Sequence, residues 1–455
     1  DSGNGGSSVV GAYQINVGLD TSVGSTGWGA GTWSRGTWGS AVDLTDPTEI
    51  LRIWTHDNYG EDLIINVRDA GIYYWDTSAY AATYARAIAL SAVSGADSTT
   101  PTIAKKVLVS DRDRHVIAFG CDSETAGGTQ DPLLIRFSDQ ETVTTWESTA
   151  TNTAGSLRLG SGSEIITAVE TREQIAVFTD VSLHAMQFLG PPFTYGINLV
   201  SENITVMSPL AAKAVDDFVF WMGLKDFYVY DGRVQKLPCT VKSYVFNDFN
   251  LAQKGKTFAG INSSFNEIWW FYPSEDSSTI DRYVIYNYVE QSWCYGTMAR
   301  SAWLDRGIIN NPLAAGLDNY LYEHETGLDD GSTDPVSGIT SYVESSQLDI
   351  GDGNKFVFIR RLVPDLTFDG SITSTPSASF TVKTRNFPGG TYLSSDASTV
   401  TQSAAATTTT VEQFTDQVHI RLRGRSFALK VSSSDTEVQW RLGSPRVDIR
   451  EDGRR

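Results

Sequence analysis

One fragment of this chain matches part of a phosphate-binding loop. Gly255-Lys256-Thr257 has the end of the nucleotide-binding pattern, in which backbone N–H groups and a lysine cradle phosphates. The pattern also needs a glycine five residues before Gly255, where Asn250 stands. The segment lies between strand-like runs, and we expect no helix after it. The sequence therefore does not predict nucleotide binding.

The residues that could ligate a metal are scattered. No two histidines have the short spacing of a metal site, and no Cys-x-x-Cys pair occurs. The acidic runs at Asp329–Asp334 and Asp349–Asn354 do not follow the twelve-residue calcium loop, and Asp-Gly turns explain them. We expect no metal and no cofactor. The residues concerned are His56, His115, His184, His324, His419, Cys121, Cys239 and Cys294. We expect the cysteines to be small buried side chains, as in a protein assembled in a reducing cytosol.

A hydrolytic site is also not predicted. The sequence has no Gly-x-Ser-x-Gly elbow. Ser138–Trp146 is similar to the Asp box of sialidases, but it is one residue too long, lacks the glycine and occurs once. We therefore assign no catalytic residue and expect that the chain is not an enzyme.

The elements that would position any site come from an internal repeat. Asp62–Asp76 and Asp217–Asp231 each hold an acidic turn, an apolar strand, a break and an aromatic strand. A two-strand unit repeated at roughly 40–60 residues is typical of a propeller blade. The sequence predicts an all-β fold, with a β-propeller of about six blades over residues 45–335. Weaker copies lie at Arg114–Phe137, Glu173–Phe188, Asn266–Tyr288 and Gly316–Glu323.

Residues 1–44 are rich in glycine and serine and are predicted to form an extended arm. Trp28, Trp33 and Trp38 recur every five residues, a period that fits neither a helix nor a plain strand. Indole rings are unfavourable in water, so these three are candidate interface residues. They would pack against the core or against a neighbouring subunit.

Residues 336–455 are predicted to form a C-terminal antiparallel β-sandwich, because short strand-like runs alternate with Asp-Gly and Pro-Gly turns. Ala404–Thr410, a low-complexity run, is predicted to be a surface excursion. Arg421, Arg423 and Arg425 alternate along one run, which would put them on one strand face. That face is a candidate docking surface or a solvated face. The expected strands are Ser341–Leu348, Phe356–Val363, Ser379–Arg385, Gln417–Arg423, Ser426–Val431 and Val438–Leu442.

The charge is unevenly distributed. The chain of 455 residues has a formal net charge of −19. Residues 336–455 hold 14 Lys+Arg and 13 Asp+Glu, a net of +1, whereas residues 1–335 hold 21 and 41, a net of −20. An acidic surface resists adhesion to phosphate backbones and anionic lipid. No apolar run approaches the roughly 18 residues of a membrane helix, and none resembles a signal peptide. We expect no membrane anchor.

Two groups of segments resemble one family of virion proteins. The first group is Gly162–Ala168, Val177–Phe193, Ser201–Ile204, Trp221–Gly223, Phe227–Gln235, Leu237–Cys239 and Val245-Phe246. The second is Glu344–Asn354, Phe358–Arg361, Gln413–Thr415, Arg421–Arg425, Gln439–Arg446 and Asp452–Arg455. Together they resemble the tail nozzle or packaged-DNA stabilisation proteins of short-tailed bacteriophages. The resemblance extends over roughly residues 160–455.

The resemblance implies a structural subunit of the virion tail, assembled in the host cytoplasm. Its copies would form a homohexameric ring that retains the genome and then passes it during ejection. The implied partners are other copies of the chain and the tail adaptor, or head-to-tail connector, with tail fibres or a distal plug as further partners. Double-stranded DNA would pass through the lumen without sequence-specific binding, and an acidic lumen would reduce its adhesion. Two other functions stay open. One is a glycan-binding or glycan-cleaving propeller of a receptor-binding tail component, with paired carboxylates near its axis. The other is a propeller that binds other proteins.

Overall fold

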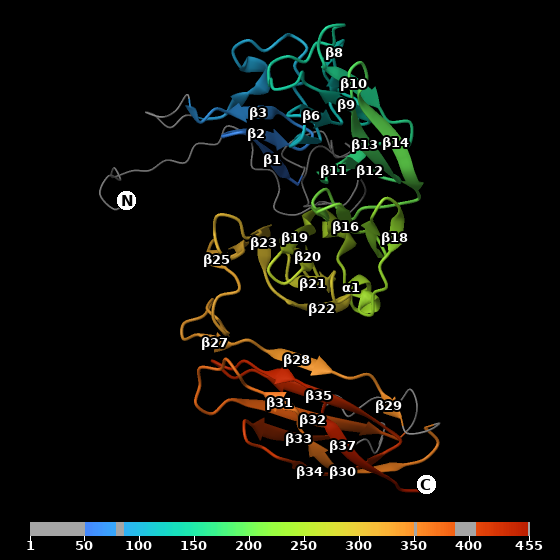
Figure 1. Ribbon diagram of the computed structural model, residues 1–455, viewed down its shortest axis with the longest axis vertical. Coiled ribbons are helices and arrows are strands. Elements are labelled where there is room, and N and C mark those ends of the chain that lie inside the picture. The colour runs from blue at the N-terminus through green and yellow to red at the C-terminus, as the bar shows by residue number, and fades with distance from the viewer. Residues whose placement is uncertain (1–50, 79–85, 350–352, 387–405, 454–455) are drawn as a thin grey trace, which may run out of the picture. The chain divides into compact units, whose positions relative to one another are not determined.

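The computed structural model describes residues 51–78, 86–349, 353–386 and 406–453, so Trp28, Trp33 and Trp38 lie outside the described residues. The predicted all-β class is confirmed, since strands make up nearly all of the regular structure described (Figure 1). The described helices are α1 (Lys242–Asn247) and the 3-10 helices η2 (Leu90–Ala92) and η3 (Leu251–Lys256). The chain divides into two compact units between His324 and Glu325.

The first unit is a series of antiparallel sheets, each built from strands that are close in sequence. Four-stranded sheets are made by β1 (Trp54–Tyr59), β2 (Asp62–Val67), β3 (Ile72–Trp75) and β4 (Ile88–Ala89), and by β10 (Gly155–Arg158), β9 (Leu134–Phe137), β6 (Val116–Phe119) and β5 (Lys106–Val109). The third sheet is β11 (Ile165–Glu170), β12 (Ile175–Thr179), β13 (Ser182–Gly190) and β14 (Thr194–Glu202). A two-stranded pair, β7 (Asp122–Ser123) and β8 (Ala126–Gln130), lies between β6 and β9 in sequence.

Three further sheets complete this unit. The fourth is β15 (Ala212–Val215), β16 (Phe218–Met222), β17 (Phe227–Tyr230) and β18 (Val234–Lys236). The fifth is β19 (Phe258–Asn262), β20 (Glu267–Tyr272), β21 (Arg282–Asn287) and β22 (Ser292–Thr297). The sixth has three described strands, β23 (Arg300–Leu304), β24 (Leu313–Gly316) and β25 (Leu321–Glu323).

The sequence copies lie on adjacent strands of these sheets. Asp62–Asp76 spans β2 and β3, and Asp217–Asp231 spans β16 and β17. Other central strands read as continuous apolar runs because both of their faces are covered: every residue of β6 and β12 is buried.

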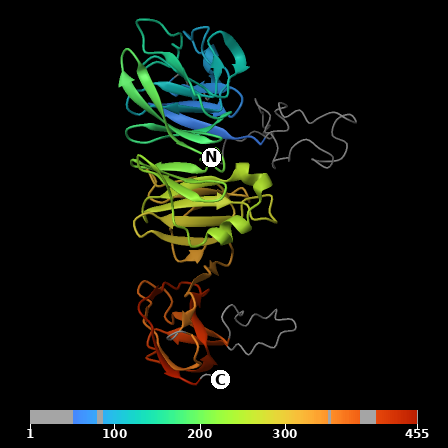
Figure 2. The same cartoon turned by 90° about the vertical axis from the view of Figure 1, so that its right-hand side faces the viewer.

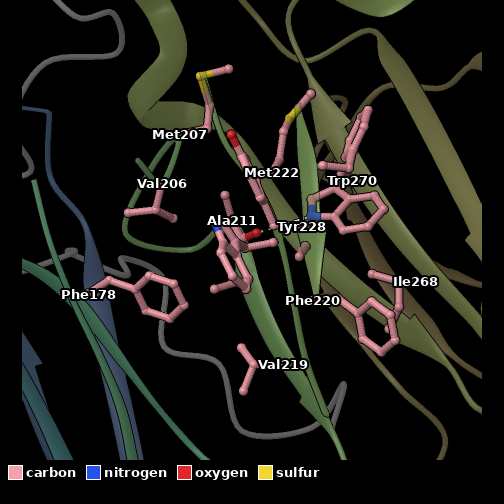
Figure 3. Packing of buried hydrophobic residues seen from close by; sticks show 14 of the residues in the cluster. Phe178, Val206, Met207, Ala211, Val219, Phe220, Met222, Tyr228, Ile268 and Trp270 are labelled. Carbon is pink, nitrogen blue, oxygen red and sulfur yellow. Dashed lines mark hydrogen bonds between the residues drawn. The ribbon is translucent and has the colours of Figure 1, made fainter. Parts of the chain in front are cut away.

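Neighbouring sheets pack face to face, so each buries apolar surface that it could not bury alone. Mixed clusters join the first sheet to the second, the second to the third, and the fifth to the sixth. The largest cluster contains residues of the third, fourth and fifth sheets, including Phe178, Trp221 and Trp270. Figure 3 shows residues of this cluster, among them Tyr228 on β17 of the fourth sheet and Trp270 on β20 of the fifth. Aromatic side chains therefore form much of the contact between sheets.

The second unit has two main sheets that share one core. One contains β28 (Ser341–Glu344), β35 (Ser426–Ser433), β32 (Ser377–Arg385) and β33 (Ala406–Glu412), with β29 (Leu348–Asp349) also on β35. The other is β34 (Val418–Gly424), β30 (Val357–Val363) and β37 (Arg446–Glu451). Side chains of both meet in a single cluster that includes Phe380 and Ile359. The unit is drawn in orange and red in Figures 1 and 2.

Three predictions for this part of the chain need correction. Ala404–Thr410 is not a surface excursion, because Ala406–Glu412 forms β33 and pairs with β32. Threonine is β-branched and suits a half-buried strand, which the low-complexity reading overlooked. The predicted strand Ser341–Leu348 is broken between β28 and β29, and the predicted strand Val438–Leu442 is reduced to β36 (Arg441–Leu442), which pairs with β31 (Leu366–Thr367).

The segment after His324 belongs to the second unit. β26 (Asp329–Asp330) pairs with β27 (Ser337–Gly338), and the backbone N–H of Glu437 donates to Asp329 Oδ1 at 2.8 Å. The predicted boundary after residue 335 therefore falls within this hairpin.

Candidate interaction surfaces and buried polar groups

The predicted arginine row is only partly a strand face. Arg421 and Arg423 lie on β34, exposed, and alternate with buried Ile420 and Leu422. Arg425 lies beyond the end of the strand and is half-buried. Its Nη1 donates to the carbonyl oxygen of Asn354 at 3.3 Å, and its guanidinium lies 4.9 Å from the Phe356 ring. Contacts within its own unit therefore hold Arg425.

The face of the β34–β30–β37 sheet carries more arginines than the sequence analysis singled out. Arg423 of β34 and Arg450 of β37 both stand opposite Phe358 of β30, so the three side chains share one face. This set, hereafter the basic face, consists of Arg360, Arg361, Arg421, Arg423, Arg446 and Arg450, all exposed. Two patterns in the sequence could have revealed these arginines. They are the alternation of Arg446, Asp448 and Arg450 and the adjacent pair Arg360-Arg361.

Structural contacts hold His115 and His324, whereas His56 and His419 are exposed and His184 is buried. Buried His115 bonds Thr153 Oγ1 through Nε2 at 3.0 Å and lies 3.4 Å from the Tyr195 hydroxyl through Nδ1. His324 accepts from Arg300 Nε at 3.1 Å, and burial lowers its pKa to about 4. Within the described ranges, no group of three His, Cys, Asp or Glu side chains is arranged to hold a metal ion.

The other chemical candidates are also engaged in local structure. Lys256 Nζ donates to the Ser278 carbonyl at 2.8 Å, and β19 follows it. Asp139, in the Ser138–Trp146 segment, accepts from the Thr153 hydroxyl at 2.6 Å. Cys121 is buried, and burial raises its pKa to about 12, whereas Cys294 is exposed, contrary to expectation.

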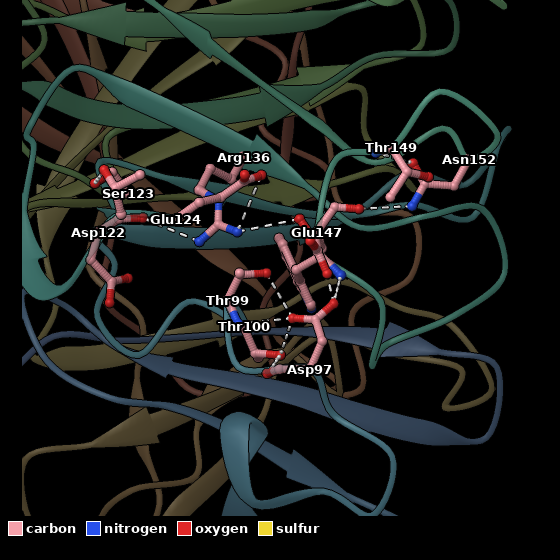
Figure 4. Close-up of polar contacts among 12 residues, drawn as sticks. Asp97, Thr99, Thr100, Asp122, Ser123, Glu124, Arg136, Glu147, Thr149 and Asn152 are labelled. Atoms are coloured by element: carbon pink, nitrogen blue, oxygen red, sulfur yellow. Dashed lines mark hydrogen bonds and ion pairs between the residues drawn. The ribbon is translucent and has the colours of Figure 1, made fainter.

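A buried arginine organises the second sheet. Arg136 on β9 is 1% exposed and donates to the carbonyl oxygens of Asp122 and Trp146, each at 3.3 Å (Figure 4). Its Nη2 lies 3.7 Å from Glu124 Oε1. Asp97, drawn beside it, accepts from the backbone N–H of Trp146 at 2.6 Å. These groups tie the segments around β9 together.

Ionisable groups from the first three sheets gather along β1, β5 and β11. Asp57 of β1 accepts from the backbone N–H of Val109 at 2.9 Å, and Lys106 Nζ donates to Thr167 Oγ1 at 3.2 Å. Glu170 Oε1 accepts from the backbone N–H of Asp111 at 3.1 Å. Burial, together with the charges of Asp111 and Asp57, raises the pKa of Glu170 to about 7.

This shift predicts a pH dependence of stability. Between its ordinary pKa of 4.5 and about 7, Glu170 keeps in the folded state a proton that the unfolded chain has lost. The contribution of Glu170 to the stability of the folded state is therefore complete below pH 4.5 and is lost as the pH rises through 7. Glu170→Gln should remove that loss, so the melting temperature of the variant should fall less from pH 5 to pH 8 than that of the wild type. Glu173→Gln, an exposed carboxyl nearby, is the control, and identical pH profiles for all three proteins would contradict the prediction.

Large apolar side chains are exposed at two places on the first unit. At the tip of the β13–β14 hairpin, Leu189 is 61% exposed and Phe193 is 74% exposed. Around the sixth sheet, Leu304, Ile308 and Leu321 are exposed as well. Apolar groups gathered in this way are typical of a surface that another molecule covers.

Comparison with known proteins gives weak structural likenesses. No family model matches the sequence, and no curated protein matches it. The extracellular domain of a one-component system of B. thetaiotaomicron is 11% identical over 60% of this chain and 32% of that chain, with a TM-score of 0.37. The chain thus spans about a third of the length of that structure.

Two other solved structures are similar at the same level. A structure of S. cerevisiae Dbp5 bound to Nup159 and Gle1 gives 8% identity over 59% of this chain and 73% of that chain, with a TM-score of 0.35. PorZ, a surface component of the type-IX secretion system of Porphyromonas gingivalis, gives 9% identity over 67% and 44%, with a TM-score of 0.26. None of the helices in the described residues has the length and apolar character needed to cross a membrane.

Proposed function

We propose that the six sheets of the first unit close into a β-propeller. Strands at one edge of each sheet make successive contacts, β1 with β5, β5 with β11, β11 with β15, β15 with β19 and β19 with β23. Leu51, just before β1, lies 3.2 Å from where a Cβ on Gly255, just before β19, would stand. Burial, and then the charge of Lys213 on β15, lowers the pKa of Lys106 on β5 to about 7. The first of these contacts, at Leu51, joins the segments before the first and the fifth sheets, and the second, at Lys106, joins the second and fourth sheets. Contacts between sheets that are not consecutive in sequence are expected in a closed ring and not in an open row.

We propose further that the chain is a structural subunit of the tail of a short-tailed bacteriophage. Copies of it would form a homohexameric nozzle through which the genome passes. The observation that carries this proposal is the concentration of negative charge in the first unit: residues 1–324 hold 21 Lys+Arg and 37 Asp+Glu, a net of −16, whereas residues 325–455 hold 14 and 17 and expose arginines. A conduit must let duplex DNA slide, and an acidic wall lacks the phosphate-neutralising cations that would trap it.

The exposed apolar side chains favour assembly as well. Repulsion between acidic copies opposes a ring, so its interfaces must be extensive. Leu189 and Phe193 at one hairpin tip, and Leu304, Ile308 and Leu321 around the sixth sheet, supply apolar area that neighbouring subunits could cover. The resemblance to nozzle proteins includes Val177–Phe193, whose last residues form this hairpin tip.

Imaging of the purified chain tests the proposal. Mass photometry and negative-stain microscopy should find rings of six copies with an open lumen, alone or after addition of the adaptor protein. A gel-shift assay with duplex DNA at about 50 mM salt should detect no retention, because few phosphates are neutralised. A chain that stays monomeric with the adaptor and is absent from tails would overturn the proposal. Binding or cleavage on a glycan panel would favour the receptor-binding alternative instead.

A further inference from the structure

We propose that the basic face of the second unit docks on the acidic first unit, residues 1–324, of a second copy of this chain. The proposal rests on the proposed function, because it names the contact that would join adjacent subunits of the ring. Each copy would place its basic face against one neighbour and its acidic surface against the basic face of the other neighbour. Such head-to-tail contacts produce closed rings when the rotation between copies closes.

A β-bulge makes this face unusually rich in arginine. In a regular strand, neighbouring residues point to opposite faces, so one of Arg360 and Arg361 would enter the core. The pairing of β30 shifts register between Ile359 and Arg361 against both β34 and β37. Ile359 and Leu362 are therefore buried while both arginines between them are exposed. The bulge, which is the place where a sheet re-aims its side chains, adds one guanidinium to the face.

Most of the guanidiniums on the face lack a partner in the described part of the chain. Arg361 lies 3.8 Å from Asp448, and Arg423 bonds Asp452 and stacks 4.1 Å from the Phe356 ring. The remaining four have no hydrogen bond or ion pair to any described residue; they are Arg360, Arg421, Arg446 and Arg450. Planar guanidiniums suit bidentate pairing with carboxylates.

Charge complementarity selects a second copy as the occupant. Residues 1–324 have a net charge of −16, so every neighbouring copy brings a large excess of carboxylates to this face. Duplex DNA presents phosphates rather than carboxylates to these arginines and is an outcome that the crosslinking test below distinguishes. Opposite potentials on two faces of one subunit also steer head-to-tail encounter and disfavour like faces meeting.

The test compares two charge-reversed proteins by mass photometry. Arg421→Glu changes the basic face, whereas Arg441→Glu changes the net charge equally at an exposed position of the same unit, on β36, outside the β34–β30–β37 sheet. The face variant should raise the dissociation constant of the ring about tenfold or more, and raised salt should weaken the wild-type ring in the same direction. The control should assemble like the wild type. Circular dichroism and melting temperatures verify that both variants are folded.

A photo-crosslinker identifies the occupant. p-Benzoylphenylalanine in place of His419, which is exposed on the same face opposite Arg361, leaves every arginine intact. With a mixture of isotopically labelled and unlabelled copies, adducts should join the face to residues 1–324 of another copy. Rings that persist in the face variant, or adducts within one copy or to DNA, overturn this inference and leave the proposed nozzle standing. A wild-type chain that forms no ring, with or without the adaptor, overturns both.

Discussion

Trp270→Ala is expected to lower the free energy of unfolding of the first unit by about 3–5 kcal/mol, the range for removing a buried aromatic side chain. Trp270 lies on β20 of the fifth sheet and is completely buried. Its indole N–H donates to the Ala211 carbonyl at 3.1 Å, just before β15. Its ring lies 4.9 Å from that of Phe227 in the fourth sheet. The substitution would open a cavity between two sheets and remove one of the two hydrogen bonds that the Ala211 carbonyl accepts, the other coming from the Met222 backbone N–H at 3.2 Å.

Chemical denaturation followed by circular dichroism measures the effect without relying on tryptophan fluorescence. Trp54→Ala is the matched control, because Trp54 on β1 is 48% exposed, and it should cost about 1 kcal/mol. Trp270→Phe keeps most of the packing but loses the hydrogen bond, so it should fall between them. Equal losses for Trp270→Ala and Trp54→Ala would mean that the interface between the fourth and fifth sheets does not hold the unit together.

The fold was predictable from the strands whose side chains are nearly all buried in the core. The middle strands of the sheets are covered on both faces, so β6, β12 and β16 read as apolar runs, and their recurrence revealed the repeat. Edge strands such as β15 carry mixed side chains, Ala-Lys-Ala-Val, and give no period of their own. In the second unit, β32 alternates buried and half-buried residues in strict period and was predicted, whereas the threonines of β33 gave no contrast.

The candidate surface was predictable only in part, because its composition depends on register. Arg421 and Arg423 alternate on one strand, which local sequence can reveal. The positions of Arg360 and Arg361 depend on a bulge set by two neighbouring strands, and no local pattern specifies it. That Arg450 stands opposite Phe358 follows from pairing between segments far apart in sequence. The structure was needed to place these arginines on one face.

Replacing Arg136 should separate the effect of hydrogen bonding from that of charge. Arg136→Ala is expected to cost about 3–5 kcal/mol, because it leaves the carbonyl oxygens of Asp122 and Trp146 unpaired and opens a cavity. Arg136→Met retains most of the side-chain volume beside the Trp146 ring and removes the desolvated charge, so we expect a smaller loss of about 1–3 kcal/mol. Urea denaturation of the purified variants gives both values.

The ion pair itself should contribute little to this difference. The Glu124 carboxylate lies 3.7 Å from Arg136, beyond hydrogen-bonding distance, so the pair gains little of the energy of a close ion pair. A double-mutant cycle of Arg136→Met with Glu124→Gln should therefore give a coupling of about 1 kcal/mol or less. A coupling above about 2 kcal/mol, or an alanine variant no less stable than the methionine variant, would assign the role of Arg136 to its charge. The expected pattern instead makes Arg136 a structural donor to two backbone carbonyls, which explains a buried arginine without any catalytic or ligand-binding role.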